Sequence, residues 1–278
     1  MNDPTPHLPP EAAEMYAMGR ESSRLLRGHN QLERVRVQEL LERFLPPVPA
    51  VVCDIGGGPG LHALWLAKRG YTVHLLDAMA LHVEQAQTAS EQQAPLASAV
   101  LGDARALPYT PESADAALLF GPLYHLTERA DRLTALCEAR RVLRPGGVLL
   151  TMSINRFAST IGGLFSGAFA DPDFMAMADQ DLLDGQHRAP PGKPYFTTSF
   201  FHHPDELRAE VAEAGFGLEA LPGVEGMSYA MLDFGERWAD PESREWIVRT
   251  ARRLEAEPTL LGVSAHVMAV GRRGPTSG

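Results

Sequence analysis

The first half of the chain alternates short apolar runs with segments whose apolar residues recur at helical spacing. Short runs rich in β-branched residues predict strands, whereas apolar positions three and four residues apart predict helices. Predicted strands span residues 51–55, 72–76, 97–101, 114–120 and 147–154. Predicted helices span residues 11–26, 31–45, 61–69, 80–93 and 127–143. Strands that alternate with helices indicate βαβ units and a parallel sheet that helices cover on both faces.

The second half of the chain keeps this alternation only in part. A predicted helix at 205–214 leads into a predicted strand at 216–221, and a last predicted strand spans 263–270. Two segments between these elements, 155–202 and 223–261, show no regular βα unit. Long segments without a regular pattern are often lids or binding loops, so we expect both to form a cap over the site.

The whole chain, residues 1–278, is predicted to form a single domain. Residues 1–10 are rich in proline, and we expect them to be a disordered tail. Residues 11–45 are expected to supply N-terminal helices, and residues 242–257 a helix within the second irregular segment.

The strongest motif is Asp54-Ile55-Gly56-Gly57-Gly58-Pro59-Gly60, which ends a predicted strand and opens a predicted helix. Its glycines let the backbone turn tightly and let a ligand lie directly against the main chain. A dinucleotide fingerprint would place its third glycine at position 61, where Leu61 stands, and no Gly-Lys-Ser/Thr of a P-loop follows. The pattern therefore favours a ligand without a pyrophosphate, with Asp54 facing the positively charged end of that ligand.

Two further carboxylates follow the next two predicted strands. Asp77 ends the second strand and can accept hydrogen bonds from both hydroxyls of an adenosine ribose. Asp103 follows the third strand and can accept from the exocyclic amine of adenine, while the next backbone N–H binds a ring nitrogen. The predicted adenosine site also includes Ala78, Met79, Gly102 and Ala104.

Together these motifs resemble the class I S-adenosylmethionine-dependent methyltransferases over residues 12–273. The glycine loop and the two acids match that family's cofactor motifs. Two more segments match, Leu118–Leu126 at the end of the fourth strand and Ala139–Gly147 at the turn from the helix into the fifth. The resemblance implies a doubly wound, Rossmann-like α/β fold with seven strands in the order 3-2-1-4-5-7-6 and an antiparallel last strand. It also implies S-adenosylmethionine as the cofactor.

We expect four more residues to contact this cofactor. The backbone carbonyl of Phe120 or Gly121 would hold its amino-acid part, and the first helix would cover it through Tyr16 and Arg20. The alternative for Tyr16 is a core aromatic, and for Arg20 a surface charge.

Tyr124 and His125 follow the fourth predicted strand and are expected to face the methyl acceptor. His125 could act as a general base, because the ordinary pKa of histidine lies near neutral pH. The alternative is that His125 packs at the start of the helix that follows. The pair His202-His203 precedes a proline and a predicted helix, so we interpret it as a helix start and expect no metal site.

Charge and hydropathy limit the classes of partner that we expect this chain to bind. The formal net charge of −10 and the lack of a basic run argue against nucleic acid. No signal peptide or membrane-spanning run is recognised, so we expect a cytoplasmic protein, as a monomer or homodimer. The leading hypothesis is methylation of O, N or C of a small-molecule acceptor. The alternatives are methylation of a protein or nucleic acid, a non-catalytic S-adenosylmethionine sensor, and a dehydrogenase.

Overall fold

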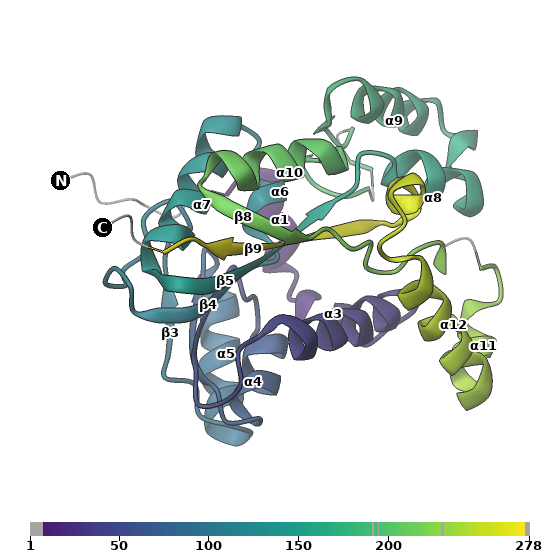
Figure 1. Cartoon of the computed structure of the whole chain (residues 1–278). Coiled ribbons are helices and arrows are strands. Elements are labelled where there is room, and N and C mark those ends of the chain that lie inside the picture. The colour runs from purple at the N-terminus through teal and green to yellow at the C-terminus, as the bar shows by residue number, and fades with distance from the viewer. Residues whose placement is uncertain (1–7, 191, 194, 229–230, 276–278) are drawn as a thin grey trace.

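The computed structural model describes residues 8–190, 192–193, 195–228 and 231–275, and a seven-stranded sheet forms its centre (Figure 1). The strands are β1 (Val51–Ile55), β2 (Thr72–Asp77), β3 (Ser98–Leu101), β4 (Ala114–Leu119), β5 (Leu143–Ile154), β8 (Phe216–Ala220) and β9 (His266–Arg273). Their order is β3-β2-β1-β4-β5-β9-β8, and β9 runs antiparallel to both of its neighbours. This order confirms the predicted fold class and topology.

Helices cover both faces of the sheet (Figure 1). One face carries α3 (Asn30–Phe44), α4 (Leu61–Ala67) and α5 (Ala80–Gln92), and the other carries α7 (Arg129–Val142) and α10 (Pro204–Glu213).

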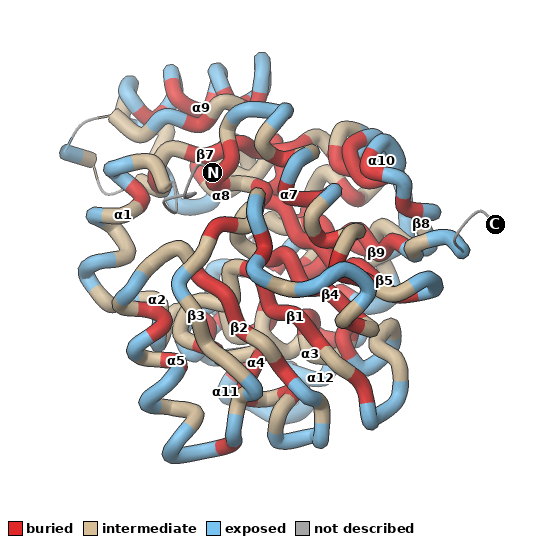
Figure 2. Tube along the Cα trace, turned by 90° about the vertical axis from the view of Figure 1, so that its left-hand side faces the viewer, coloured by how far each residue is buried: buried red, intermediate tan, exposed pale blue. Residues whose placement is uncertain are grey.

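Two hydrophobic cores fill the spaces between the sheet and these helices. Val52 and Leu118 point into the core under α3 and α4, whereas Cys53 and Leu119 point into the core under α7 and α10. The alternation follows from the two-residue period of a strand. Figure 2 shows the central strands as the most deeply buried part of the chain.

The N-terminal segment is less regular than predicted. A single helix over 11–26 was expected, but the structure has α1 (Pro10–Ala17) and a single turn, α2 (Glu21–Arg24). The break lies at Gly19, which adopts a φ of +67°, a conformation that glycine alone adopts without strain. Of the predicted disordered tail, residues 1–7 lie outside the described residues, and α1 already begins at Pro10.

The first irregular segment contains more structure than the sequence indicated. It holds α8 (Ala158–Ser166), the 3₁₀ turn η1 (Ala168–Ala170), α9 (Pro172–Asp184) and a small antiparallel pair, β6 (Gln186–His187) with β7 (Ser199–Phe200). The start of α9 follows ordinary capping rules, because Asp171 accepts a hydrogen bond from the backbone of Asp173 and Pro172 occupies the first helical position.

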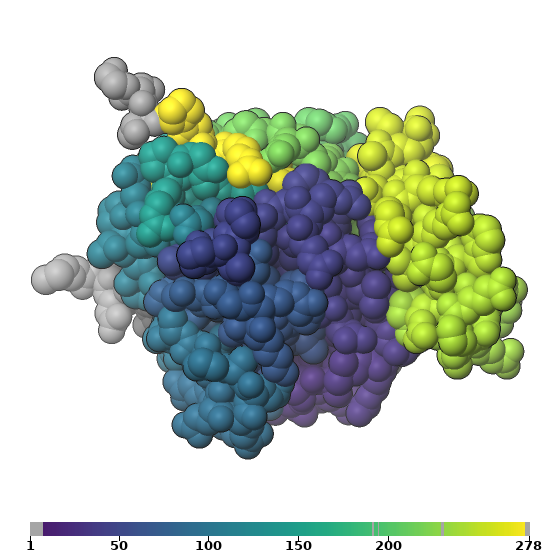
Figure 3. All heavy atoms as spheres, turned by 60° about the horizontal axis from the view of Figure 1, so that its bottom comes forward, coloured from purple at the N-terminus to yellow at the C-terminus, as the bar shows by residue number. Residues whose placement is uncertain are grey.

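The second irregular segment is a helical hairpin, α11 (Phe234–Ala239) and α12 (Pro241–Leu254), followed by the 3₁₀ turn η3 (Pro258–Val263). Figure 3 shows it as a yellow-green lobe beside the purple N-terminal helices. Phe234 and Trp238 pack against Leu32 of α3, and the Trp238 indole N–H donates to the side-chain oxygen of Gln31 at 3.1 Å. This lobe therefore supports α3. No helix of the described residues has the length and apolarity that a membrane span requires.

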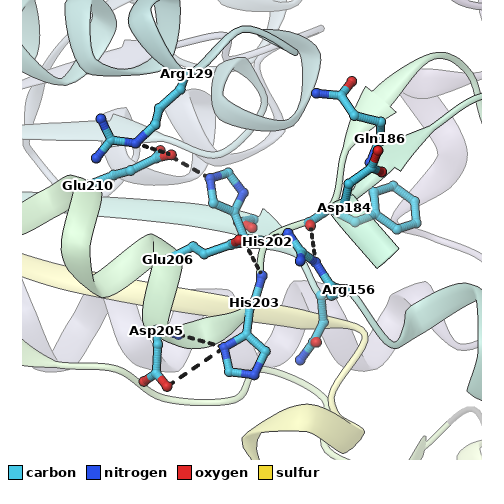
Figure 4. A network of polar contacts seen from close by, with 12 residues as sticks. Arg129, Arg156, Asp184, Gln186, His202, His203, Asp205, Glu206 and Glu210 are labelled. Carbon is cyan, nitrogen blue, oxygen red and sulfur yellow. Dashed lines mark hydrogen bonds and ion pairs between the residues drawn. The ribbon is translucent and has the colours of Figure 1, made fainter. Parts of the chain in front are cut away.

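The His202-His203 pair starts α10, as the sequence analysis favoured (Figure 4). The His203 imidazole accepts a hydrogen bond from the backbone N–H of Asp205, and the Glu206 carboxylate accepts one from the backbone N–H of His203. This reciprocal arrangement is a capping box, which satisfies two N–H groups that the first turn leaves free.

His202 belongs to a buried ion network that joins α10 to α7 (Figure 4). Its Nε2 lies 3.2 Å from a carboxylate oxygen of Glu210, and the guanidinium of Arg132 lies 2.8 Å from the other oxygen. Burial alone would raise the pKa of Glu210, but the hydrogen bonds from His202 and Arg132 outweigh burial and lower it to about 2. The charged form of Glu210 therefore stabilises the fold.

We predict that Glu210→Gln lowers the free energy of unfolding by about 3–5 kcal/mol at neutral pH, because it leaves the buried Arg132 charge without a counter-ion. The stabilisation by Glu210 is fully present above the ordinary glutamate pKa of 4.5 and is lost as the pH falls toward 2. Urea denaturation at several pH values measures this, and Glu213→Gln, which removes an exposed partner of Arg129, is the control. Equal effects of the two substitutions at neutral pH would contradict the prediction.

Candidate active site

A cavity of about 530 Å³ opens at the carboxyl edge of the parallel strands. This volume lies within the range of ~300–1,000 Å³ that is typical of small-molecule sites. Fifteen of the sixteen predicted site residues line it: Tyr16, Asp54, Gly56, Gly57, Gly58, Asp77, Ala78, Met79, Gly102, Asp103, Ala104, Phe120, Gly121, Tyr124 and His125. The remaining one, Arg20, is exposed and is not part of the lining.

The glycine loop is held tightly between β2 and α6 (Pro122–His125). The backbone N–H of Gly56 donates to the carbonyl of Leu76 at 2.7 Å. Gly56 has a φ of +74°, and a Cβ at this position would lie 2.6 Å from Cδ of Pro122. A Cβ on Gly57 would lie 2.8 Å from the Asp54 carboxyl carbon. Both positions therefore require glycine for this close approach of the backbone.

Asp77 is oriented by the backbone around it. One carboxylate oxygen accepts from the N–H of Gly58 at 2.8 Å. The other accepts from the N–H of Met79 at 2.9 Å and lies 3.0 Å from Nδ1 of His82. These contacts fix the carboxylate at the cavity wall, where the sequence analysis predicted the ribose acid.

Asp103 is oriented by a neighbouring arginine. Its carboxylate accepts from the backbone N–H of Arg105 at 2.8 Å and from the Arg105 guanidinium at 2.7 Å. The Arg105 guanidinium also donates to the Asp131 carboxylate at 3.0 Å, which holds the Arg105–Asp103 pair in place. The contact of Asp103 with adenine stays a prediction.

Asp54 is the acid whose environment points most directly to a ligand. It is 2% exposed, and its Oδ2 has no hydrogen-bond partner in the described part of the chain. Burial, and then the nearby charge of Asp77, raise the pKa of Asp54 to about 7. Buried polar atoms without partners are rare and ask for an explanation, and a bound cation or donor is one.

Five more buried polar atoms of the cavity residues lack partners among the described residues. They are Nε of Arg34, Nδ1 of His62, Nε2 of His82, Oε1 of Gln85 and Nδ1 of His125. With the Oδ2 of Asp54 and the glycine cradle, they fit a polar, nucleoside-like ligand with a positively charged end.

The N-terminal segment covers the cavity. The Tyr16 hydroxyl lies 2.7 Å from Nε2 of His125, and Arg24 donates to both carboxylate oxygens of the buried Glu33 at 2.8 and 3.1 Å. Arg24 also donates to Glu21. Arg24 and Arg34 line the cavity, whereas Arg20 does not, because the break at Gly19 turns α2 toward α3. The contact of Arg20 with the cofactor stays a prediction.

The two candidate catalytic residues lie side by side on α6. His125 is buried, and this burial lowers its pKa to about 4, so that the imidazole is neutral and weakly basic at neutral pH. The charges of Asp77 and His82 also act on His125, which places it toward the predicted ribose end. The general-base role of His125 stays a prediction that its burial disfavours. Burial raises the pKa of the Tyr124 hydroxyl, whose ionisable neighbours include Arg24.

Neither irregular segment supplies a described residue to the cavity lining. The first segment contacts α6 through Phe196, whose ring centroid lies 6.1 Å from that of Tyr124 and 6.2 Å from that of His125. The second supports α3. The observed cover is therefore the N-terminal segment, and a cap role for 155–202 and 223–261 stays a prediction.

Several polar residues of the cavity were not predicted from the sequence: Arg24, Glu33, His62 and His82. All four lie on helices, where a charged or polar residue ordinarily indicates the solvent face. The one available signal was Glu33 directly after Leu32, on a predicted helix that had to pack against the sheet.

Comparisons with known proteins agree with this geometry. Residues 53–151 match a family model described as a methyltransferase domain. The chain is 30% identical over 130 residues to the ubiquinone/menaquinone biosynthesis C-methyltransferase UbiE of Dinoroseobacter shibae, covering 45% of this chain and 50% of that protein. It is 34% identical over 118 residues to the malonyl-[acyl-carrier protein] O-methyltransferase of Xylella fastidiosa, covering 41% of this chain and 38% of that protein.

Solved structures share the fold. An S-adenosylmethionine-dependent methyltransferase from Methanosarcina mazei superposes with a TM-score of 0.57 at 16% identity, covering 85% of this chain and 97% of that one. Residues 53–151 thus form a methyltransferase domain, and the fold of the chain is that of the class I S-adenosylmethionine-dependent methyltransferases. S-adenosylmethionine is the cofactor of this family, as the glycine loop and acids indicated. The chain spans half or less of the two curated relatives named above.

We predict that the affinity of this methyltransferase domain for S-adenosylmethionine rises with pH through neutrality. Below its pKa of about 7 Asp54 is protonated, and above it the carboxylate attracts the cationic end of the cofactor. Binding should strengthen by up to about tenfold per pH unit below that pKa. Calorimetric titration between about pH 5.5 and pH 8.5 measures this, and Asp54→Asn should flatten the profile. An unchanged pH dependence in Asp54→Asn would contradict the assignment.

Proposed function

We propose that this chain transfers the methyl group of S-adenosylmethionine to O, N or C of a small-molecule acceptor. The observation that carries the proposal is that one covered cavity is lined both by the predicted adenosine residues and by a second polar group. This group comprises Arg24, Glu33, His62 and Tyr124, which interact electrostatically, and Met152 also lines the cavity. We infer that the adenosine residues mark one end of the cavity and this group the other. A nucleoside cofactor at the first end leaves the second for an acceptor.

S-adenosylmethionine supplies a methyl group that its sulfonium already activates, so the protein mainly has to align the two reactants. Such alignment can lower a barrier by ~7–11 kcal/mol. Asp77 would bind the ribose hydroxyls, and the Asp54 carboxylate would balance the positive charge at the other end of the cofactor. The Tyr16–His125 contact would hold the cover closed and exclude water.

A small acceptor suits the cover and the charge of the chain. The N-terminal segment is held over the cavity by the partly buried Arg24–Glu33 ion pair, and the net charge is −10, which disfavours a nucleic acid. The two curated relatives are named as a C- and an O-methyltransferase, so they leave the methylated atom open. Methylation of a protein or nucleic acid, and a non-catalytic sensor, are the alternatives. The monomer or homodimer expectation stays a prediction.

The first test is binding. Calorimetry should show S-adenosylmethionine and S-adenosylhomocysteine binding with one site per chain, and NAD should not bind. Asp77→Asn should weaken binding about 10- to 100-fold, because it removes charged acceptors of two ribose hydroxyls. The matched control, Asp205→Asn in the exposed first turn of α10, should bind like the parent protein. Binding of NAD alone would overturn the cofactor assignment.

The second test is turnover. The protein, S-adenosylmethionine and a panel of small hydroxyl, amine and carbon acids are incubated, and mass spectrometry detects S-adenosylhomocysteine together with a methylated acceptor. We expect at least one acceptor to be methylated, and Asp77→Asn to lower its kcat/KM. Tight cofactor binding with methylation of a protein or nucleic acid and of no small molecule would contradict the acceptor class.

A further inference from the structure

A compact group of three potential metal ligands lies outside the predicted site residues, and one of its members, Glu33, lines the cavity. Glu33 comes from α3, Glu225 from the loop after β8, and His266 is the first residue of β9. One ligand atom from each of them lies within 4.8 Å of the others. The two carboxylate side chains are 3% and 5% exposed and that of His266 is 18% exposed.

Surrounding residues hold each ligand in place. Arg24 fixes Glu33 through its two hydrogen bonds, and Glu33 also lines the cavity. Glu225 accepts from the Ser264 hydroxyl at 3.2 Å and from the backbone N–H of His266 at 3.0 Å, and its other oxygen contacts the His266 imidazole. The bonds from Arg24 and Ser264 are outer contacts of the kind that orients metal ligands, whereas the Glu225–His266 contact joins two of the proposed ligands directly.

The charge balance of this group favours a cation among its members. Two buried carboxylates at this separation repel each other, and the low local dielectric strengthens the repulsion. Arg24 compensates the negative charge of Glu33 from one side. The space between the ligands thus attracts either a proton on His266 or a metal ion.

We propose that Glu33, Glu225 and His266 bind one divalent cation of the zinc or manganese type. Two carboxylates and an imidazole, with no thiolate, are the donors that these ions accept. Three protein ligands leave coordination positions open, as in catalytic metal sites. Because Glu33 lines the cavity, an open position would face the acceptor end and could bind an acceptor oxygen. The proposed metal site does not depend on methyl transfer.

The test is metal binding to the full-length chain after removal of metals by a chelator. Calorimetry with zinc chloride, manganese chloride and, for contrast, magnesium chloride should show one equivalent of zinc or manganese bound with micromolar affinity. Glu225→Gln and His266→Asn should weaken this binding by about 100-fold or more, beyond the ~10–100-fold that the loss of an outer contact costs. His203→Asn, at an exposed helix cap, is the matched control and should not change it.

Binding of S-adenosylhomocysteine to each variant reports whether the variant is folded, separately from its metal affinity. If the variants do not fold, the cobalt(II) absorption spectrum of the parent chain decides, because bands of a site with oxygen and nitrogen ligands would support the proposal. No saturable binding of zinc or manganese to the parent chain would overturn it, as would binding that Glu225→Gln and His266→Asn leave unchanged. The cation of the cluster would then be protonated His266.

Discussion

The parallel pairing of β1 with β2 and β4 is the constraint on which the site depends. The register pairs Ile55 with Leu76 on one side and with Leu119 on the other, so the three strands end level with one another. The residues that follow, Gly56, Asp77 and Phe120, must therefore meet at one edge of the sheet. Strand order reverses at β1, and this reversal opens the crevice in which α/β sheets bind their ligands.

The cover over this crevice depends on electrostatic contacts that extend far from it. Arg24 holds α2 to Glu33 of α3, and α3 is in turn tied to the second irregular segment. The fully buried Arg36 of α3 forms ion pairs with Glu39 and with Glu255, which follows α12. The α11–α12 lobe thus packs on α3, which lines the cavity, but supplies no described residue to the lining itself. Removing either partner of such a buried pair is costly, because the other charge is left uncompensated.

The sequence predicted those parts of the molecule that repeat or that lie close together along the chain. The alternation of strands and helices, the glycine loop and the acids after successive strands follow from local patterns, and the structure places them as expected. The order of the last two strands came from the resemblance to a known family, since periodicity alone carries no information on pairing.

The parts that the sequence could not predict arise from contacts between distant residues. Gly19 interrupts an otherwise helical pattern, and after the resulting turn Arg24 lines the cavity and Arg20 does not. Burial also changes chemistry in ways that residue type does not reveal: His125 becomes a weak base and Asp54 a carboxyl that titrates near neutrality. The group of Glu33, Glu225 and His266 joins three elements that only the folded sheet brings together.

The most direct measurement of the central claim is a crystal structure of the full chain with S-adenosylhomocysteine. The account predicts the ligand in the cavity beneath α1 and α2, with its ribose hydroxyls on Asp77 and its ammonium group close to Asp54. It further predicts that Arg24 and Glu33 lie beyond the ligand, beside the space that is left for the acceptor. A ligand bound elsewhere, or bound in the cavity without contact to Asp54 and Asp77, would contradict it.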